Sequence, residues 1–193
     1  MRFLLRLLLP GLAWAATGLA LAASPLVTPL QLKALGKAGA RVIDIREGSA
    51  YALQHVPGAV SAPYPRWRLP GANPGLPPAP ADLTALVQEL GLTADTPVVV
   101  IYTGIDGTDF GGAARVYWTL KSLGVQQLSI LNGGLTAWKA AGLPVSNQAS
   151  AAARSAWKPQ FNPQWMATRE QVRASLEQAG VLRVDARPAP FFQ

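Results

Sequence analysis

The stretch VVVIYTGIDGTDFGGAARVYW, residues 98–118, predicts a β-strand that leads through a glycine-bearing loop into a helix. Strand-forming residues fill positions 98–102, and we expect the helix to begin near Gly111. In α/β proteins, a strand, a tight loop and a helix N-terminus form the place where a nucleophile is held or an anion binds. The first question is therefore which residue of this loop could carry chemistry.

The sequence around this stretch alternates short apolar strands with helical segments. Further strands are predicted at 42–45 and 128–131, and further helices at 29–36, 82–90 and 134–141. Asp82 is expected to cap the helix that it begins. This alternation predicts an α/β fold with a parallel sheet flanked by helices. Residues 63–80 contain seven prolines and are predicted to form a long loop.

Two motifs recur with constant spacing. Thr28 and Thr168 both look like helix N-caps and lie 140 positions apart (168 − 28). The stretch RVDAR at 183–187 has the same Asp-x-Arg pattern as VIDIR at 42–46. The repeat predicts one complete domain over 26–146, a linker over 147–165 that is rich in small and polar residues, and the incomplete start of a second copy over 166–193. We expect that start to be loosely held, because it lacks a core of its own.

Residues 1–22 resemble a secretory signal peptide. Arg2 and Arg6 precede a leucine-rich stretch, and Ala20-Leu21-Ala22 fits a cleavage site. We therefore expect cleavage after Ala22, export to the periplasm and no stable membrane insertion afterwards. An uncleaved membrane anchor is the alternative, because residues 3–21 could almost span a bilayer.

Composition excludes several classes of site. The 193 residues include no cysteine and a single histidine, so disulfides, thiolate metal sites, a cysteine nucleophile and a multi-histidine site are all excluded within this chain. No metal or cofactor is expected. Removal of residues 1–22 leaves 15 basic and 10 acidic residues, which are scattered; without a basic run, no nucleic-acid partner is expected.

Two further stretches carry a family resemblance: VIDIREGSAYALQHVPGAV at 42–60 and LNGGLTAWKAAGLPV at 131–145. Together with the proline-rich loop, they resemble the rhodanese family of sulfurtransferases, in particular its tandem-domain members of the thiosulfate and 3-mercaptopyruvate type. Gln54 stands where the family usually has glycine. The resemblance covers about 26–146 and again 166–192. It implies a rhodanese-like fold, with a second domain truncated early.

The resemblance implies a sulfurtransferase activity, but this chain lacks the cysteine on which that activity depends. Active domains of this family place a cysteine after the central strand, where backbone N–H groups stabilise the thiolate and the persulfide. Here that position is Thr103, whose hydroxyl cannot carry sulfane sulfur as a stable persulfide. Asp106 and Asp109 in the same loop would repel an anionic donor. We predict that this domain is catalytically silent and that the cysteine belongs to the second domain, beyond residue 193.

The implied reaction moves sulfur from a small anionic donor, thiosulfate or 3-mercaptopyruvate, to a thiol or cyanide-like acceptor. Arg187 matches a family arginine that contributes to substrate binding; an ion pair with Asp185 is the alternative interpretation. A second arginine is usual in the family where this chain has Phe191.

Other motif residues are predicted to be structural. Asp44 and Arg46 are expected to orient loops at the edge of the sheet, and His55 to organise a loop rather than to catalyse. In the second motif the structural residues are Gly133, Gly134 and Trp138.

Three predictions concern charged or aromatic residues outside these motifs. Asp106 and Asp109 are a weak metal signal, because further ligands are lacking. Arg115 is expected to be a surface charge, with anion binding as the alternative. From the family alone, Trp67 and Arg68 are expected to pack against the second domain.

Three functions remain open at this point. The first is an exported sulfurtransferase of which this chain is the amino-terminal part. The second is a non-catalytic rhodanese-like module that binds a partner or an anion. A phosphatase related to the rhodanese fold is the third, and it needs the same missing cysteine.

Overall fold

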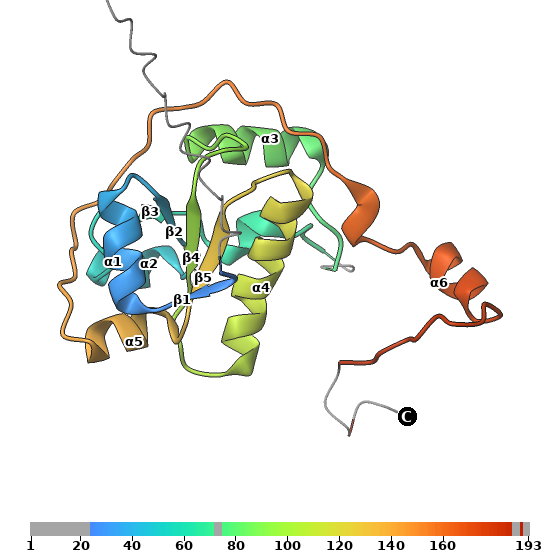
Figure 1. Cartoon of the computed structure of the whole chain (residues 1–193). Coiled ribbons are helices and arrows are strands. Elements are labelled where there is room, and N and C mark those ends of the chain that lie inside the picture. Colours follow the sequence, from blue (N-terminus) through green and yellow to red (C-terminus); the bar gives the residue numbers. More distant parts are fainter. Residues whose placement is uncertain (1–23, 72–74, 187–189, 191–193) are drawn as a thin grey trace, which may run out of the picture.

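A computed structural model describes residues 24–71, 75–186 and 190 of the chain (Figure 1). The predicted signal peptide, residues 1–22, lies outside the described residues. Five parallel strands form one sheet in the order β1-β5-β4-β2-β3, which places β4 at the centre. The strands are β1 (Leu26–Val27), β2 (Arg41–Asp44), β3 (Val60–Ser61), β4 (Val98–Ile101) and β5 (Leu128–Leu131).

Helices cover both faces of the sheet (Figure 1). Side chains alternate along β4: Val98 and Val100 join the core beneath α3 (Pro80–Glu89) and α4 (Gly107–Ser122), whereas Val99 and Ile101 face the opposite core. That opposite core is covered by α1 (Pro29–Lys37), α2 (Gly48–Leu53) and α5 (Gly134–Ala140). A central parallel strand buried on both faces explains the continuous valine run in the sequence. The predicted α/β fold is confirmed.

Two helix starts differ from the predictions. α4 begins at Gly107 instead of near Gly111, because Asp106 caps it by accepting a hydrogen bond from the Asp109 N–H at 2.8 Å. α3 begins at Pro80 with Ala79 as its N-cap, and Asp82 lies in the first turn instead of capping the helix. Proline at the first helical position is favourable, since its missing N–H has no partner there anyway.

The segment that contains the predicted linker follows the surface of the α/β sheet domain closely. Ser146 exchanges two backbone hydrogen bonds of 2.8 Å with His55, the Ser155 N–H donates to the Gln88 carbonyl at 2.9 Å, and the Asn162 N–H donates to the Ser122 carbonyl at 2.7 Å. Figure 1 shows this segment running from α5 around α3 toward α4. We call residues 146–165 the strap. Except in the short 3-10 helix η2 (Pro163–Trp165), it is held by these contacts and not by regular secondary structure.

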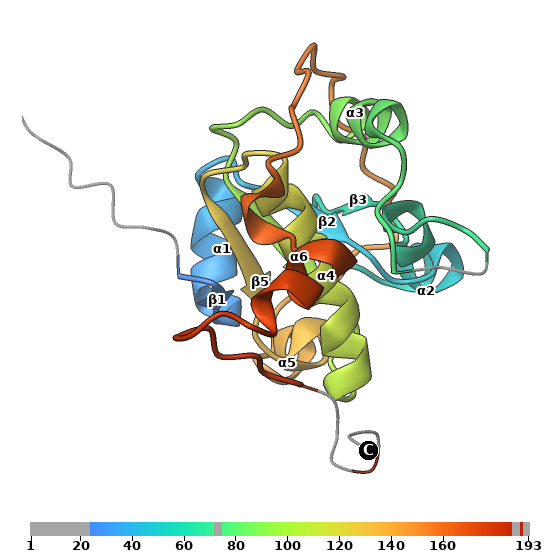
Figure 2. The same cartoon turned by 90° about the vertical axis from the view of Figure 1, so that its right-hand side faces the viewer.

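Among the described residues after the strap, the one α-helix is α6 (Arg169–Ser175). Thr168 and Gln171 make a capping box at its start, as Thr28 and Gln31 do at α1, so both copies of the repeated cap form the same local structure. Residues 181–186 form no strand, and almost every residue from 162 to 186 is exposed. Figures 1 and 2 show α6 on the outer side of α4, away from the sheet. Among the described residues, no helix combines the length and apolar character needed to cross a bilayer.

Candidate functional site

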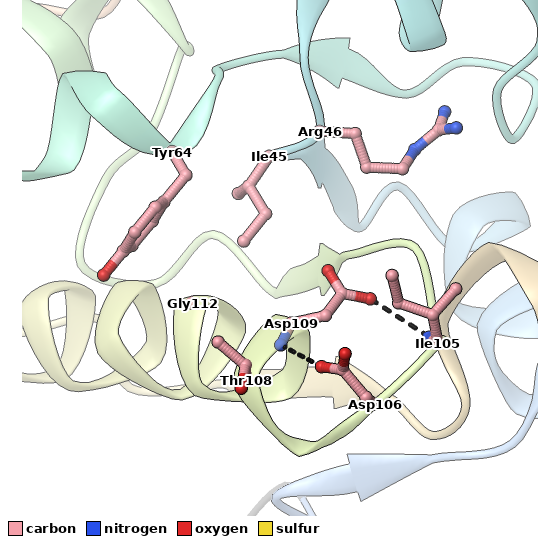
Figure 3. A pocket seen from close by; sticks show the side chains of 8 residues that line it. All are labelled: Ile45, Arg46, Tyr64, Ile105, Asp106, Thr108, Asp109 and Gly112. Carbon is pink, nitrogen blue, oxygen red and sulfur yellow. Dashed lines mark hydrogen bonds between the residues drawn. The ribbon is translucent and has the colours of Figure 1, made fainter.

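The loop after β4 lies at the carboxyl edge of the sheet, between the central strand and α4. Residues 102–106 connect the two elements, so Thr103 stands two positions after the end of the strand. A pocket of about 340 Å³ opens beside this loop. Figure 3 shows the residues that line it: Ile45, Arg46, Tyr64, Ile105, Asp106, Thr108, Asp109 and Gly112.

The backbone N–H groups of this loop point at a carboxylate of the chain itself. Asp109 Oδ2 accepts hydrogen bonds from the Gly104 N–H at 2.7 Å and from the Ile105 N–H at 3.2 Å. The Thr103 N–H reaches Asp109 Oδ1 at 3.4 Å. Figure 3 shows the bond to Ile105 and the bond from Asp109 to Asp106. Donors that could hold a bound anion therefore already have an anionic partner.

Close backbone packing fixes the shape of the loop. Gly104 has a φ of +90°, and a Cβ there would overlap the carbonyl oxygen of Gly133. Gly134 has a φ of +58°, and a Cβ there would come within 2.5 Å of the Tyr102 carbonyl oxygen. Gly134 thus serves the contact between the loop and α5, whereas a Cβ at Gly133, whose φ is +73°, would meet Ala137 within α5 itself. Burial raises the pKa of the Tyr102 phenol, an effect that the nearby Gly133 backbone partly offsets.

The Asp44–Arg46 pair lies at the carboxyl end of β2. Arg46 Nη2 donates to Asp44 Oδ2 at 2.6 Å and to the Gln54 carbonyl at 2.7 Å, while Arg46 Nε donates to Asp44 Oδ1 at 2.9 Å. Both side chains are buried. In Figure 3 the Arg46 guanidinium points away from Asp109. The pair links the end of β2 to the backbone of Gln54, so its role is structural.

His55 connects α2 to the strap. Its Nδ1 lies 2.7 Å from the Tyr51 carbonyl oxygen and its Nε2 lies 3.0 Å from the Gln148 carbonyl oxygen. The imidazole also stacks on the Tyr51 ring with 3.9 Å between ring centres. The side chain is fully buried. It holds two segments together and does not face the pocket beside the β4–α4 loop.

Trp138 of the second motif and Trp67 of the proline-rich loop both belong to the core around the sheet. Trp138 is buried and donates from Nε1 to the Pro144 carbonyl at 2.8 Å. Trp67 is completely buried and donates to the Ala62 carbonyl at 3.0 Å. The expectation that Trp67 packs against a second domain is therefore wrong, since its indole fills this domain's own core. Arg68 instead lies over the Tyr64 ring, with Cζ 5.2 Å from the ring centre.

The remaining predicted residues lie away from this pocket or outside the described residues. Asp185 is exposed in the segment after α6, and Arg187 lies outside the described residues. Within the part of the chain that the structure describes, no three His, Cys, Asp or Glu side chains come together as metal ligands. Asp106 and Asp109 act instead on backbone N–H groups of the loop and of α4.

Sequence reasoning recognised Asp109 as a charge but missed its partners. It placed the residue in a loop, whereas the residue lies in the first turn of α4. Asp106 three positions earlier is the signal that could have located this helix start, because Asp is a favoured N-cap residue.

Comparison with protein families identifies the domain type. The rhodanese-like domain model matches residues 28–141. The thiosulfate sulfurtransferase of Pseudomonas aeruginosa is 34% identical over 148 residues, which cover 76% of this chain and 53% of that protein. A probable 3-mercaptopyruvate sulfurtransferase of the same organism is 34% identical over 152 residues, covering 74% of this chain and 51% of that protein. This chain thus spans about half the length of these relatives.

Solved structures agree on the fold. SseA from Escherichia coli, described as a 3-mercaptopyruvate sulfotransferase of rhodanese fold, superimposes with a TM-score of 0.73 at 24% identity. The match covers 88% of this chain and 68% of SseA. At this level of identity the likeness concerns the fold.

Proposed function

Because the chain belongs to the rhodanese-like domain family, we propose that it is the catalytically silent first domain of a sulfurtransferase. The whole protein moves sulfane sulfur from thiosulfate or 3-mercaptopyruvate to a thiol or cyanide-like acceptor. A cysteine persulfide carries the sulfur, and this cysteine comes from a second rhodanese-like domain that begins at about residue 166. The relatives named thiosulfate and 3-mercaptopyruvate sulfurtransferase support this assignment.

The proposal that this domain is catalytically silent depends on the loop after β4, whose backbone N–H donors already have the Asp109 carboxylate as their acceptor. Thr103 cannot form a stable persulfide, and the Asp109 carboxylate accepts hydrogen bonds from the N–H groups that would stabilise an anion there. A negatively charged donor approaching this loop would meet a negative charge instead of free donors. Sulfur chemistry at this edge of the sheet therefore needs a different loop.

Support for the second domain comes from the repeated cap. Thr168 with Gln171 forms the same capping box as Thr28 with Gln31, at a spacing of 140 residues (168 − 28). Val172 of α6 and its C-cap residue Leu176 are 46% and 60% exposed, so the helix has an apolar face that the described residues leave uncovered and that suits the core of a second domain. Arg187 is proposed to contact the anionic donor in that domain.

Thiocyanate production tests the silent role. The purified 193-residue chain is incubated with thiosulfate and cyanide, and we expect no thiocyanate above the uncatalysed rate. A tandem thiosulfate sulfurtransferase serves as positive control. Catalytic thiocyanate formation by the chain alone would contradict the assignment of Thr103 to the cysteine position.

A second candidate is a non-catalytic rhodanese-like module that binds a partner or an anion, and the absence of cysteine favours it. The reading frame separates the two candidates. Continuation into a second strand–loop–helix with cysteine after the strand supports the sulfurtransferase, whereas a stop codon directly after residue 193 supports the binding module.

Export is part of the proposal. Residues 1–22 direct the chain to the periplasm and are removed after Ala22. N-terminal sequencing of protein recovered from a periplasmic extract is expected to begin at Ala23. Recovery of an intact amino terminus from the membrane fraction would favour the anchor.

A further inference from the structure

A second pocket lies on the other side of the sheet from the β4–α4 loop, between α1 and α5, and we call it the α1–α5 pocket. Its volume is about 240 Å³. Its apolar lining comes from segments far apart in the sequence: Leu32, Val42, Val56, Pro57, Trp138 and Pro144. Figure 1 shows α1, α2 and α5 together on this side of the sheet, with α4 on the other. The α1–α5 pocket is therefore separate from the pocket that Asp106 and Asp109 line.

The buried side chains of the α1–α5 pocket offer no free polar group to a ligand. Leu32, Val42 and Val56 carry only hydrocarbon and are at most 5% exposed. The Trp138 indole N–H already donates to the Pro144 carbonyl at 2.8 Å, so the ring presents apolar surface to the pocket. An apolar group that displaces water from such a lining gains free energy.

The rim of the α1–α5 pocket is positively charged and open to solvent. Lys33 and Lys37 both line the pocket, and both are exposed. They lie four positions apart on α1, so their side chains leave the same face of the helix one turn apart. Among the described residues, no ion pair includes either lysine. The two ammonium groups repel each other, and an anion bound at the rim relieves that repulsion.

The end of α1 opposes a bound anion only in part. The helix ends at Lys37, and its last carbonyl groups together carry about half an elementary negative charge. Lys33 and Lys37 bring two full positive charges to the last two turns of the same helix. The balance of charge at the rim therefore favours an anion.

We propose that the α1–α5 pocket binds a small monocarboxylate with an apolar body, for which phenylacetate is the probe. The apolar body lies against Trp138 and Val56, and the carboxylate lies at the rim with the two lysines. Pockets for drug-sized ligands begin at about 300 Å³, so this smaller volume suits a single ring or a short alkyl chain. The site does not depend on the proposed sulfur transfer, because its residues lie on the opposite side of the sheet from Thr103.

Titration of the ¹⁵N-labelled chain with phenylacetate, followed by NMR, tests the site. We expect the Trp138 indole N–H signal to shift and to reach saturation. The Trp67 indole, which is completely buried in the opposite core, should not respond. Phenylacetamide has the same shape without the charge and should bind about threefold more weakly or worse. Acetate has the charge without the ring and should cause no saturable shift.

Substitution of the lysines separates their effect from that of overall charge. Lys33→Met combined with Lys37→Met should weaken phenylacetate binding about threefold or more and leave phenylacetamide binding within about twofold. Lys121→Met combined with Lys158→Met removes the same charge from α4 and the strap, and it should leave both affinities within about twofold.

Gly36 allows a variant that fills the pocket. Gly36 lines the pocket and nothing lies within 4 Å of its would-be Cβ, so Gly36→Phe introduces a ring without a clash at Cβ. Binding of phenylacetate and of phenylacetamide should both be lost. Gly107→Phe, whose would-be Cβ is equally free on α4, is the control and should bind as the unmodified chain does. Circular dichroism and the melting temperature establish that each variant is folded.

Several outcomes would overturn the site. One is the absence of a saturable Trp138 shift, and another is an equal loss of affinity in the two lysine pairs, because overall charge would then explain binding. Unchanged affinity in Gly36→Phe would place the ligand elsewhere. A dimer of the chain that Gly36→Phe dissociates would show that a second copy covers the pocket. The thiocyanate assay reports on sulfur transfer separately, so the two proposals can fail independently.

Discussion

The Asp109 carboxylate lies 2.7 Å from the backbone nitrogen of Gly104, so the first turn of α4 is tied to the loop that follows the central strand. Through this contact the protein supplies an anion from its own sequence at the edge of the sheet. The loop thereby satisfies its backbone donors without a ligand.

Removal of this carboxylate should loosen the loop. Asp109→Ala leaves the N–H groups of Gly104 and Ile105 without their acceptor, and we expect the free energy of unfolding to fall by about 1–3 kcal/mol. Hydrogen exchange at these two amides should accelerate. Asp82→Asn, in the exposed first turn of α3, is the control and should cost under about 1 kcal/mol. Unchanged amide protection in Asp109→Ala would show that the carboxylate does not hold the loop.

A cysteine placed at position 103 should remain an ordinary thiol while Asp109 is charged. The nearby carboxylate disfavours a thiolate, so Thr103→Cys should react slowly with iodoacetamide at neutral pH. Adding Asp109→Asn removes the charge, and the reaction should accelerate roughly tenfold, as expected for a thiol pKa about one unit lower. A thiol on α3, Thr84→Cys, should not respond to Asp109→Asn. Equal rates for Thr103→Cys with and without Asp109→Asn would contradict this electrostatic effect.

The close approach of the loop to α5 predicts a strong effect at Gly104. Gly104→Ala puts a methyl group into the Gly133 carbonyl and strains a positive φ, so we expect a loss of more than about 3 kcal/mol or failure to fold. Gly107→Ala is the matched control, since nothing lies within 4 Å of its would-be Cβ and alanine is the better helix former. It should leave stability unchanged or raise it by up to about 1 kcal/mol. Urea unfolding measures both variants, and equal stabilities would refute the packing argument.

His55 should determine how firmly the strap is held. His55→Phe keeps an aromatic ring to stack on Tyr51 but loses the contacts of both ring nitrogens, so we expect a loss of about 1–3 kcal/mol and faster hydrogen exchange over 146–150. Leu53→Ala, at a side chain that is 75% exposed on the neighbouring helix α2, should change stability by less than about 0.5 kcal/mol. Wild-type exchange over 146–150 in His55→Phe would show that other contacts hold the strap.

Local patterns determined much of this protein. The valine run of β4, the alternation of strands and helices, and the cap at Thr28 are properties of short segments, so periodicity and composition predict the α/β fold. The absence of cysteine follows from composition alone, and it excludes a persulfide on this chain. The two-residue strands β1 and β3 were missed because such short segments show no period.

Only the tertiary structure decided which partners the individual side chains have. Periodicity did not predict that the His55 imidazole would contact the Gln148 carbonyl oxygen, 93 positions away. It also did not predict that Trp67 would be buried in the core beneath α3 and α4. The partners of Asp109 likewise depend on how the first turn of α4 packs against the loop after β4. Such contacts arise when distant segments share one core, and a single sequence carries no local signal for them.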